Sequence, residues 1–252
     1  RYNPRMDFIT VEESDKVLRI NFVRSPVNAI NQQFLLELND VLDKYQDSTD
    51  SSVVVFSGSD LKFFSFGLDI PEYLKLDRDS LKGSLNLLVS TCKKIYQYPK
   101  ITISKINGHA TGGGCMIALS TDFRYMADGR SKIALNEVNI GLSLFFSTIQ
   151  ILKSIVGNQN AKIILYSGKM FSPYEAKDLG LVDLVYDSDE LVEKNVSSYA
   201  KKDIDAIKDL KKSLNIYDES ALLDSNEKLE LFLDIFYSEK TQEILKKIKI
   251  NK

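Results

Sequence analysis

The sequence predicts an α/β fold, and three observations support this. Short apolar runs at residues 17–23, 53–57 and 101–106 predict strands, and segments with helical spacing alternate with them. The run Val53-Val-Val-Phe-Ser57 is continuously apolar, as is typical of a strand buried on both faces of a sheet. Turn residues close two of these runs, Gly58 and Asn107-Gly108. Alternating strands and helices of this kind are typical of α/β proteins.

The first half of the chain has a strand, helix, strand order. Residues 24–31 are rich in turn formers and follow the first predicted strand. Residues 32–45 predict a helix because their apolar side chains recur at helical spacing: Phe34, Leu35, Leu38, Val41, Leu42 and Tyr45. A second helix is predicted over 84–98, ending before Pro99.

The second half becomes increasingly helical. A short apolar helix is predicted at 115–119, a helix-rich stretch at 148–180 and a last strand at 181–185. From Asp189 the chain is rich in Lys, Glu and Leu with helical periodicity. We therefore predict a core over residues 1–189 and a helical C-terminal region over 190–252.

The composition favours a globular protein that acts on a small molecule. The chain has 252 residues, of which 44% are hydrophobic and 27% are charged, enough to bury a sizeable core. Its 33 basic and 35 acidic residues nearly cancel, so no overall field attracts nucleic acid or an anionic membrane. No apolar run reaches the roughly 18 residues that a membrane span needs. We expect a soluble protein with no membrane span and no nucleic-acid partner.

Few side chains are available for metal or nucleophilic chemistry. The two cysteines, Cys92 and Cys115, form neither a CxxC motif nor a Cys/His ligand pattern, so no disulfide framework or zinc site is indicated. His109 is the single histidine, and any Ser-His-Asp or Cys-His catalysis would have to use it. The composition thus favours carboxylates and backbone dipoles, and we expect neither a metal nor a cofactor.

Two glycine segments are candidates for binding a negative oxygen. Gly112-Gly-Gly114 precedes an apolar helix, whose first N–H groups lack partners within the helix. Gly67 interrupts Phe63-Phe-Ser-Phe-Gly-Leu-Asp-Ile70 and could turn the N–H of Leu68 outward. Two converging N–H groups would form an oxyanion hole, which suits a thioester whose carbonyl becomes an enolate. The alternative for each segment is an ordinary tight turn.

Glu137 is the candidate general base. Its neighbours in Ile133-Ala-Leu-Asn-Glu-Val-Asn-Ile-Gly-Leu142 are largely apolar, and burial among them would raise the pKa of the carboxyl toward neutrality. The alternative is a solvated surface acid, as most of the 35 acids must be. For His109 we favour a structural role in its loop over a role as a proton carrier.

Together with Arg24-Ser-Pro-Val-Asn-Ala-Ile30, these segments resemble the enoyl-CoA hydratase/isomerase (crotonase) family in order and spacing, over roughly residues 7–190. The segments 106–115 and Ser172-Pro-Tyr-Glu-Ala176 are also similar to that family. The resemblance implies a crotonase-like spiral of ββα units, with a helical C-terminal region that forms a homotrimer or a dimer of trimers. It also implies an acyl-CoA substrate. It leaves the compartment open: the mitochondrial matrix or peroxisome in a eukaryote, the cytoplasm in a bacterium.

The resemblance also implies roles for individual residues. The N–H groups of Leu68 and Gly113 would form the oxyanion hole, and Glu137 would be the base. Coenzyme A would lie against the loop formed by Phe66, Gly67, Leu68, Asp69 and Ile70, and near Arg24, Asn28 and Ala29. Asn136 would lie next to the substrate.

The choice of reaction depends on Met116. Hydratases of this family use two glutamates, and Met116 occupies the position of the first, so only Glu137 remains. One carboxylate is enough to move the double bond of a 3-enoyl-CoA to the 2-trans position, as in the β-oxidation of unsaturated fatty acids. Pro26-Val-Asn28, Gly67-Leu-Asp69 and Leu135-Asn-Glu137 likewise resemble Δ3,Δ2-enoyl-CoA isomerases more closely than hydratases.

Other activities stay open within the resemblance. They are a hydratase, a thioester hydrolase or a decarboxylase of the same family, and a noncatalytic acyl-CoA-binding or RNA-binding relative. The chain also departs from the common family pattern at Phe66 and at Ser143-Leu-Phe-Phe146, which add bulk where an acyl chain could lie. These two departures leave the preferred acyl chain length undecided.

Overall fold

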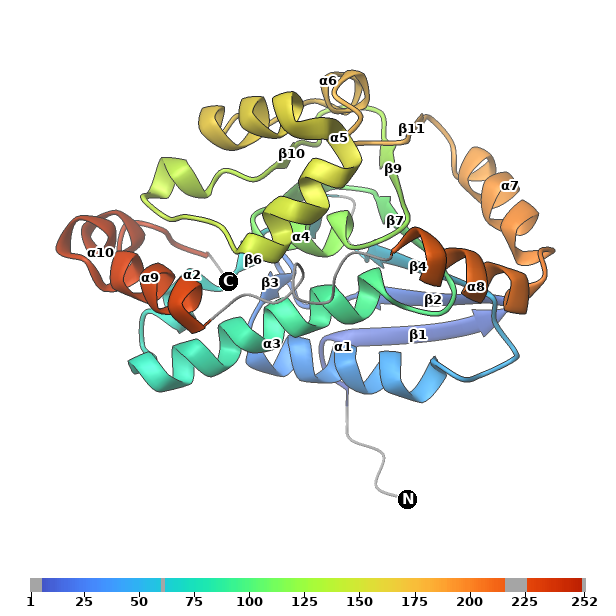
Figure 1. Cartoon of the computed structure of the whole chain (residues 1–252), viewed down its shortest axis with the longest axis horizontal. Coiled ribbons are helices and arrows are strands. Elements are labelled where there is room, and N and C mark those ends of the chain that lie inside the picture. The colour runs from blue at the N-terminus through green and yellow to red at the C-terminus, as the bar shows by residue number, and fades with distance from the viewer. Residues whose placement is uncertain (1–5, 60–61, 216–225, 251–252) are drawn as a thin grey trace.

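A six-stranded sheet runs through the computed structural model, which describes residues 6–59, 62–215 and 226–250 (Figure 1). The first two strands pair antiparallel and all other neighbours in the sheet pair parallel. The strands follow in the order β1 (Ile9–Ser14), β2 (Val17–Phe22), β4 (Val53–Gly58), β7 (Ile101–Ile106), β9 (Phe123–Ala127) and β11 (Leu184–Tyr186).

Two smaller sheets are built from short strands, again with parallel neighbours. One has the order β10 (Ile133–Ala134), β8 (His109–Thr111) and β5 (Phe63–Ser65). The other pairs β3 (Ala29–Ile30) with β6 (Gly67–Leu68). Each turn of the chain therefore contributes a long strand to the large sheet and then a short strand to a small one.

A helix completes each of these turns. The helices of the core are α1 (Gln32–Tyr45), α2 (Ile70–Tyr73), α3 (Arg78–Tyr96), α4 (Gly113–Leu119), the 3-10 helix η1 (Glu137–Ile140), α5 (Phe146–Ser167) and α6 (Pro173–Asp178). In Figure 1, α1, α3, α4 and α5 lie on the near side of the large sheet. The predicted α/β class and the spiral of ββα units are confirmed.

The large sheet is buried on both faces, as the apolar run in β4 predicts. Val54 and Phe56 point into the main core beneath the helices, whereas Val53 and Val55 point to a second, smaller core. Alternate residues of a strand face opposite sides, so a strand covered on both sides must be apolar throughout.

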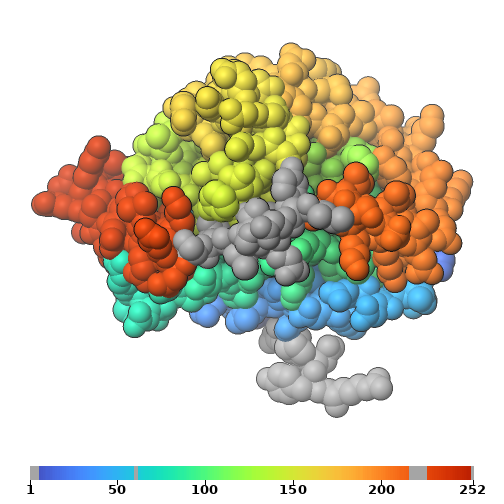
Figure 2. Space-filling model, in the orientation of Figure 1, coloured from blue at the N-terminus to red at the C-terminus, as the bar shows by residue number. Residues whose placement is uncertain are grey.

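The C-terminal helices are divided between two ends of the molecule (Figure 2). They are α7 (Asp189–Ala200), α8 (Ile204–Leu214), α9 (Asn226–Tyr237) and α10 (Glu239–Leu245). Val192 and Val196 of α7 complete the second core, and α9 packs Leu229, Phe232, Leu233 and Phe236 into the main core. The division at residue 190 stays a prediction, and residues 1–5, 60–61, 216–225 and 251–252 of the two units lie outside the described residues.

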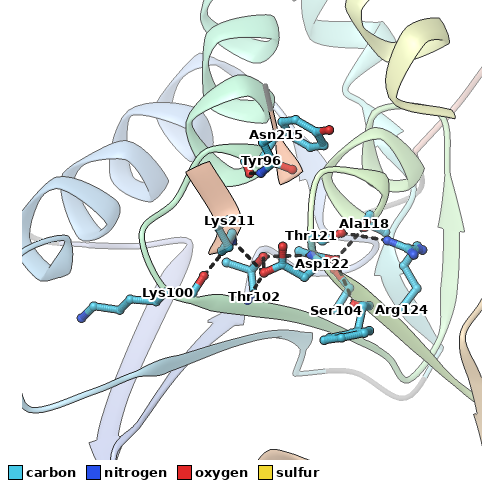
Figure 3. A network of polar contacts seen from close by, with 11 residues as sticks. Tyr96, Lys100, Thr102, Ser104, Ala118, Thr121, Asp122, Arg124, Lys211 and Asn215 are labelled. Atoms are coloured by element: carbon cyan, nitrogen blue, oxygen red, sulfur yellow. Dashed lines mark hydrogen bonds and ion pairs between the residues drawn. The ribbon is translucent and has the colours of Figure 1, made fainter. Parts of the chain in front are cut away.

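Polar contacts hold α8 to the core (Figure 3). The Lys211 ammonium donates to the carbonyl oxygen of Lys100 and to Oδ2 of Asp122, both at 2.7 Å. The side chain of Asn215 donates to the carbonyl oxygen of Tyr96 at 2.9 Å. These contacts join residues more than a hundred positions apart except for the pair Lys211 and Asp122, which lie 89 apart.

Most predicted elements are confirmed, and two differ. The helix predicted to start at 84 begins at Arg78, because the Asp77 side chain caps it by accepting from the N–H of Ser80. The strand predicted at 181–185 is found at 184–186, because the N–H of Leu181 closes the turn after α6 by donating to the carbonyl oxygen of Ala176.

Strand β1 is an additional element that the apolar pattern does not reveal. It is an edge strand with four of its six residues exposed, so it lacks the apolar run on which the strand predictions relied. None of the helices in the described part of the chain has the length and hydropathy required to cross a bilayer.

Candidate active site

Gly67 allows two loops to approach more closely than side chains would permit. Its φ is +98°, and a Cβ atom there would lie 2.7 Å from the carbonyl oxygen of Thr111 and 3.0 Å from the N of Gly113. Only glycine tolerates both the positive φ and this spacing. The start of β6 is thereby held against the start of α4.

The backbone direction at Leu68 follows from its neighbour. The N–H of Asp69 donates to the carbonyl oxygen of Ile30 in β3 at 2.9 Å. Because successive N–H groups of an extended strand point in opposite directions, the N–H of Leu68 points away from β3. Gly113, the first residue of α4, belongs to the helix turn whose N–H groups lack acceptors within the helix.

A cavity of about 260 Å³ lies where these two segments meet. Its wall is mostly apolar. The lining residues are Phe66, Leu68, Ile70, Thr111, Gly112, Gly113, Met116, Asn136, Glu137, Ile140, Leu142, Phe145, Met170, Phe232 and Ile248. We call it the inner cavity.

Glu137 is the acid of the inner cavity. Only 8% of the residue is exposed, and its Oε2 has no hydrogen-bond partner among the described residues. Burial raises the pKa of its carboxyl to about 7, and a hydrogen bond from its own backbone N–H opposes the shift. The other oxygen, Oε1, lies 3.5 Å from where a Cβ on Gly112 would be, so the carboxyl faces the glycine turn.

The turn that carries Glu137 is held from both sides. The carbonyl oxygen of Glu137 accepts from the N–H of Leu142 at 3.0 Å, and Gly141 ends the 3-10 helix with a φ of +75°. The hydroxyl of Thr241 in α10 donates to the carbonyl oxygen of Gly141 at 3.2 Å. A C-terminal helix therefore helps to fix the position of the acid.

Six of the residues predicted from the sequence line the inner cavity together: Phe66, Leu68, Ile70, Gly113, Asn136 and Glu137. Gly67 lies beneath it as the backbone turn described above. Arg24, Ala29 and Asp69 line a neighbouring cavity of about 290 Å³, which we call the polar cavity, together with Glu72 and Lys75.

Arg24 is already paired. Its guanidinium donates to Oδ2 of Asp69 at 2.7 Å, to Oε2 of Glu72 at 3.2 Å and to the carbonyl oxygen of Ala29 at 2.7 Å. A phosphate of coenzyme A would have to compete with these two carboxylates, a condition that the sequence does not reveal.

Asn28 lies outside both cavities. It is 3% exposed with a φ of +49°, and its side-chain amide donates to the carbonyl oxygens of Phe63 and Phe64 at 3.1 and 3.2 Å. Its place in the structure is to brace the loop that leads to Leu68. The structure does not bring its side chain to a surface that a ligand could reach.

His109 also has a structural setting, as favoured from the sequence. Its Nδ1 accepts from the N–H of Lys132 at 3.1 Å, and its ring centroid lies 5.4 Å from that of Phe63. Burial lowers the pKa of the imidazole, which favours the neutral form that this acceptor role needs.

Sequence reasoning missed the part of the cavity wall that comes from distant segments. Leu142, Met170, Phe232 and Ile248 were not predicted to line a site. The apolar spacing in α9 could have indicated that Phe232 is buried, but not what it faces. In the described part of the chain, no three His, Cys, Asp or Glu side chains gather as metal ligands would.

Comparisons with known proteins identify relatives of this chain. Residues 12–248 match the family model described as enoyl-CoA hydratase/isomerase. The chain is 28% identical over 202 residues to mitochondrial enoyl-CoA delta isomerase 1 of Homo sapiens, covering 80% of this chain and 67% of that protein. It is 33% identical over 200 residues to a probable enoyl-CoA hydratase of Bacillus subtilis, covering 77% of this chain and 74% of that protein.

The fold is also that of a solved structure. The crystal structure of human mitochondrial delta3-delta2-enoyl-CoA isomerase superposes with a TM-score of 0.88 at 24% identity, covering 95% of this chain and 96% of that one. This similarity concerns the fold. In sequence, relatives named as isomerases and as hydratases are similarly close.

Proposed function

The chain belongs to the enoyl-CoA hydratase/isomerase family, and from this we propose that it is an isomerase that converts 3-enoyl-CoA to 2-trans-enoyl-CoA with Glu137 as its single acid–base group. The observation that carries the proposal is the composition of the inner cavity. Among the described residues that line it, Glu137 is the only acid or base that titrates near neutral pH.

Hydration needs more groups than this cavity offers. Adding water across a double bond requires activation of the water and delivery of a proton to C2. Hydratases of the family are expected to share these tasks between two glutamates, and Met116 stands at the first of the two positions. Its thioether lines the cavity and cannot exchange a proton. An allylic shift needs only one group that first takes and then returns a proton.

In the proposed reaction, the Glu137 carboxylate removes a proton from C2 of the 3-enoyl thioester. The electron pair of the broken C–H bond is delocalised over the diene and the thioester oxygen as a dienolate. The protonated Glu137 then returns the proton at C4, leaving the double bond between C2 and C3. No water is consumed and no cofactor is needed.

The negative thioester oxygen requires stabilisation by donors that are already in place. We propose the N–H groups of Leu68 and Gly113, whose loops Gly67 holds together. A donor of this kind contributes about 10²- to 10³-fold to the rate. A positioned base contributes about 10²- to 10⁴-fold. Both contributions are needed for useful turnover.

The electrostatics of Glu137 suit this cycle. A carboxyl with a pKa of about 7 is ionised in a large fraction of molecules at neutral pH and is still basic enough to accept a carbon-bound proton. It is also acidic enough, once protonated, to give the proton back. An exposed glutamate would be a much weaker base.

The test is to incubate the protein separately with 3-hexenoyl-CoA and 2-hexenoyl-CoA. We expect the first to give the conjugated 2-trans product, measured by its absorbance and by chromatography, and the second to undergo little hydration. Hydration of 2-hexenoyl-CoA without isomerisation of 3-hexenoyl-CoA would assign the chain to the hydratases. Release of free CoA from either compound would assign it to the thioester hydrolases.

A further inference from the structure

Two buried aromatic rings separate the inner cavity from a second, outer one. Phe145 directly precedes α5, Phe232 lies on α9, and they are 3% and 5% exposed. Their ring centroids are 4.9 Å apart with the planes tilted by 31°. Both rings line the inner cavity, and both also line an outer cavity of about 120 Å³. The pair is therefore a wall with space on either side.

The inner cavity has a polar neighbour on another side. The segment 68–71 separates the two spaces: Leu68 and Ile70 face the inner cavity, whereas Asp69 and Pro71 face the polar cavity. Arg24, Glu72 and Lys75 make that neighbouring space charged. An acyl-CoA has a polar end and an apolar tail. The polar end would lie toward the polar cavity, where its phosphates compete with Asp69 and Glu72 for Arg24, and the apolar side of Leu142, Phe145 and Phe232 suits the tail.

The wall depends on the C-terminal region as much as on the core. Phe232 shares one face of α9 with Leu229, Leu233 and Phe236, all of which are buried. Figure 1 shows α9 and α10 at the same end of the molecule as α2, whose first residue, Ile70, also lines the inner cavity. Phe232 is thus fixed by the packing of a whole helix and does not lie on a loose loop.

We propose that Phe145 and Phe232 form the end wall of the acyl subsite and set the upper limit on the length of the acyl chain. This inference rests on the proposed function, because it assumes that the inner cavity holds an acyl thioester. At about 260 Å³ the cavity lies just below the roughly 300–1,000 Å³ of pockets that hold drug-sized ligands. A short tail fits in front of the rings, whereas a long tail has to displace them.

Removing one ring joins the inner cavity to the outer one. Ser143, Leu144, Phe146 and Ile149 then continue the channel, with Leu231 of α9 on the opposite side. Its apolar side chains suit additional methylene groups, whereas Ser143 and Lys228 make part of its wall polar. Leu231 offers a matched control, because it is the neighbour of Phe232 on the same helix, is 54% exposed and lines only the outer cavity.

The experiment compares Phe232→Ala, Phe145→Ala and Leu231→Ala with the parent protein. The ratio of kcat/KM for 3-dodecenoyl-CoA to that for 3-hexenoyl-CoA is measured for each. We expect the parent to favour the short substrate by about 10-fold or more, and each Phe→Ala change to raise the ratio by about 10-fold or more. Leu231→Ala should leave the ratio within about twofold of the parent. Phe232→Leu, which keeps an apolar side chain in the core, replaces Phe232→Ala if the latter does not fold.

A binding measurement separates this inference from the proposed function. Calorimetry with octanoyl-CoA and dodecanoyl-CoA requires no turnover. If no 3-enoyl-CoA is isomerised but Phe232→Ala still gains affinity selectively for dodecanoyl-CoA, the wall stands and the proposed reaction fails. If the parent accepts both chain lengths equally, or if the Phe→Ala and Leu231→Ala variants share one chain-length profile, the wall is refuted.

Discussion

Glu137 and Asp122 are two acids of the same spiral, and the fold surrounds them in opposite ways. Asp122 precedes β9, and its Oδ2 accepts from the N–H of Thr102, the hydroxyl of Thr102 and the ammonium of Lys211, at 2.7, 3.0 and 2.7 Å (Figure 3). Glu137 follows β10 and is buried with its Oε2 unpartnered among the described residues. One carboxylate is engaged by β7 and helix α8 through its Oδ2, and the other is left available.

The difference shows how a fold distinguishes a structural acid from a reactive one. Three donors hold Oδ2 of Asp122 in place and tie this side chain to β7 and α8. Burial without donors destabilises the charged form and raises the pKa, here to about 7 for Glu137. Perturbed acids of the second kind gather at functional sites. The following variants test whether this contrast governs activity and stability.

The largest expected effect is on turnover. Glu137→Gln keeps the shape of the side chain but removes its basicity, and we expect kcat for 3-hexenoyl-CoA to fall by about 10²- to 10⁴-fold. Asp122→Asn is the matched control, because it neutralises an acid that lies outside the inner cavity. Its folded fraction should keep nearly full activity. A loss of the same size in both variants would remove the distinction between the two acids.

The next effect is the pH dependence of the rate. Because the base must be ionised, kcat/KM should rise about tenfold per pH unit below pH 7 and level off above it, following the raised pKa of Glu137 in the free protein. The measurement is kcat/KM for isomerisation of 3-hexenoyl-CoA between pH 5 and 9. A rate that is already constant at pH 5 would mean that the base has the ordinary pKa of an exposed carboxyl.

The smallest effects are on stability, and they should have opposite signs. Lys211→Met removes the ion pair of Asp122 and should lower the free energy of unfolding by about 1–3 kcal/mol. Glu137→Gln should raise it by about 1–3 kcal/mol at pH 8, where the native protein must hold a buried charge. The measurement is urea unfolding of both variants at pH 5 and pH 8.

The pH determines how much Glu137→Gln raises the free energy of unfolding. The pKa of Glu137 is raised on folding from 4.5 to about 7, so the native state holds this proton more tightly than the unfolded chain. The contribution of the proton to stability is fully present below pH 4.5 and is lost as the pH rises to 7. The gain from Glu137→Gln should therefore shrink at pH 5. An equal gain at both pH values would show that burial of the charge is not its cause.

The sequence predicted the reactive acid better than the structural one. The apolar neighbours of Glu137, such as Ile133 and Leu135, already indicated burial, and both are fully buried. Asp122 gave no comparable signal, because its partner Lys211 is 89 positions away and comes from another layer. Pairing of distant polar groups depends on how the helices pack and cannot be derived from local pattern.

The same limit applies to the rest of the site. Strands β4 and β7 and helix α1 follow from local apolar spacing, and the glycines at 67 and 112–114 marked where the backbone turns. The far wall of the inner cavity, with Phe232 from α9, and the contact of Thr241 with Gly141 depend on where the C-terminal helices fold back. The ion pairs of Arg24 with Asp69 and Glu72 could not be predicted from the sequence for the same reason.

Transfer of a label tests the central claim most directly. 3-Hexenoyl-CoA deuterated at C2 is converted by the parent protein and by Glu137→Gln, and the product is analysed for deuterium at C4 by mass spectrometry and NMR. If Glu137 alone carries the proton, the parent should deliver part of the deuterium to C4, and the variant should form almost no product. Product formed by the variant at the parental rate, with its C4 hydrogen drawn wholly from water, would contradict the account.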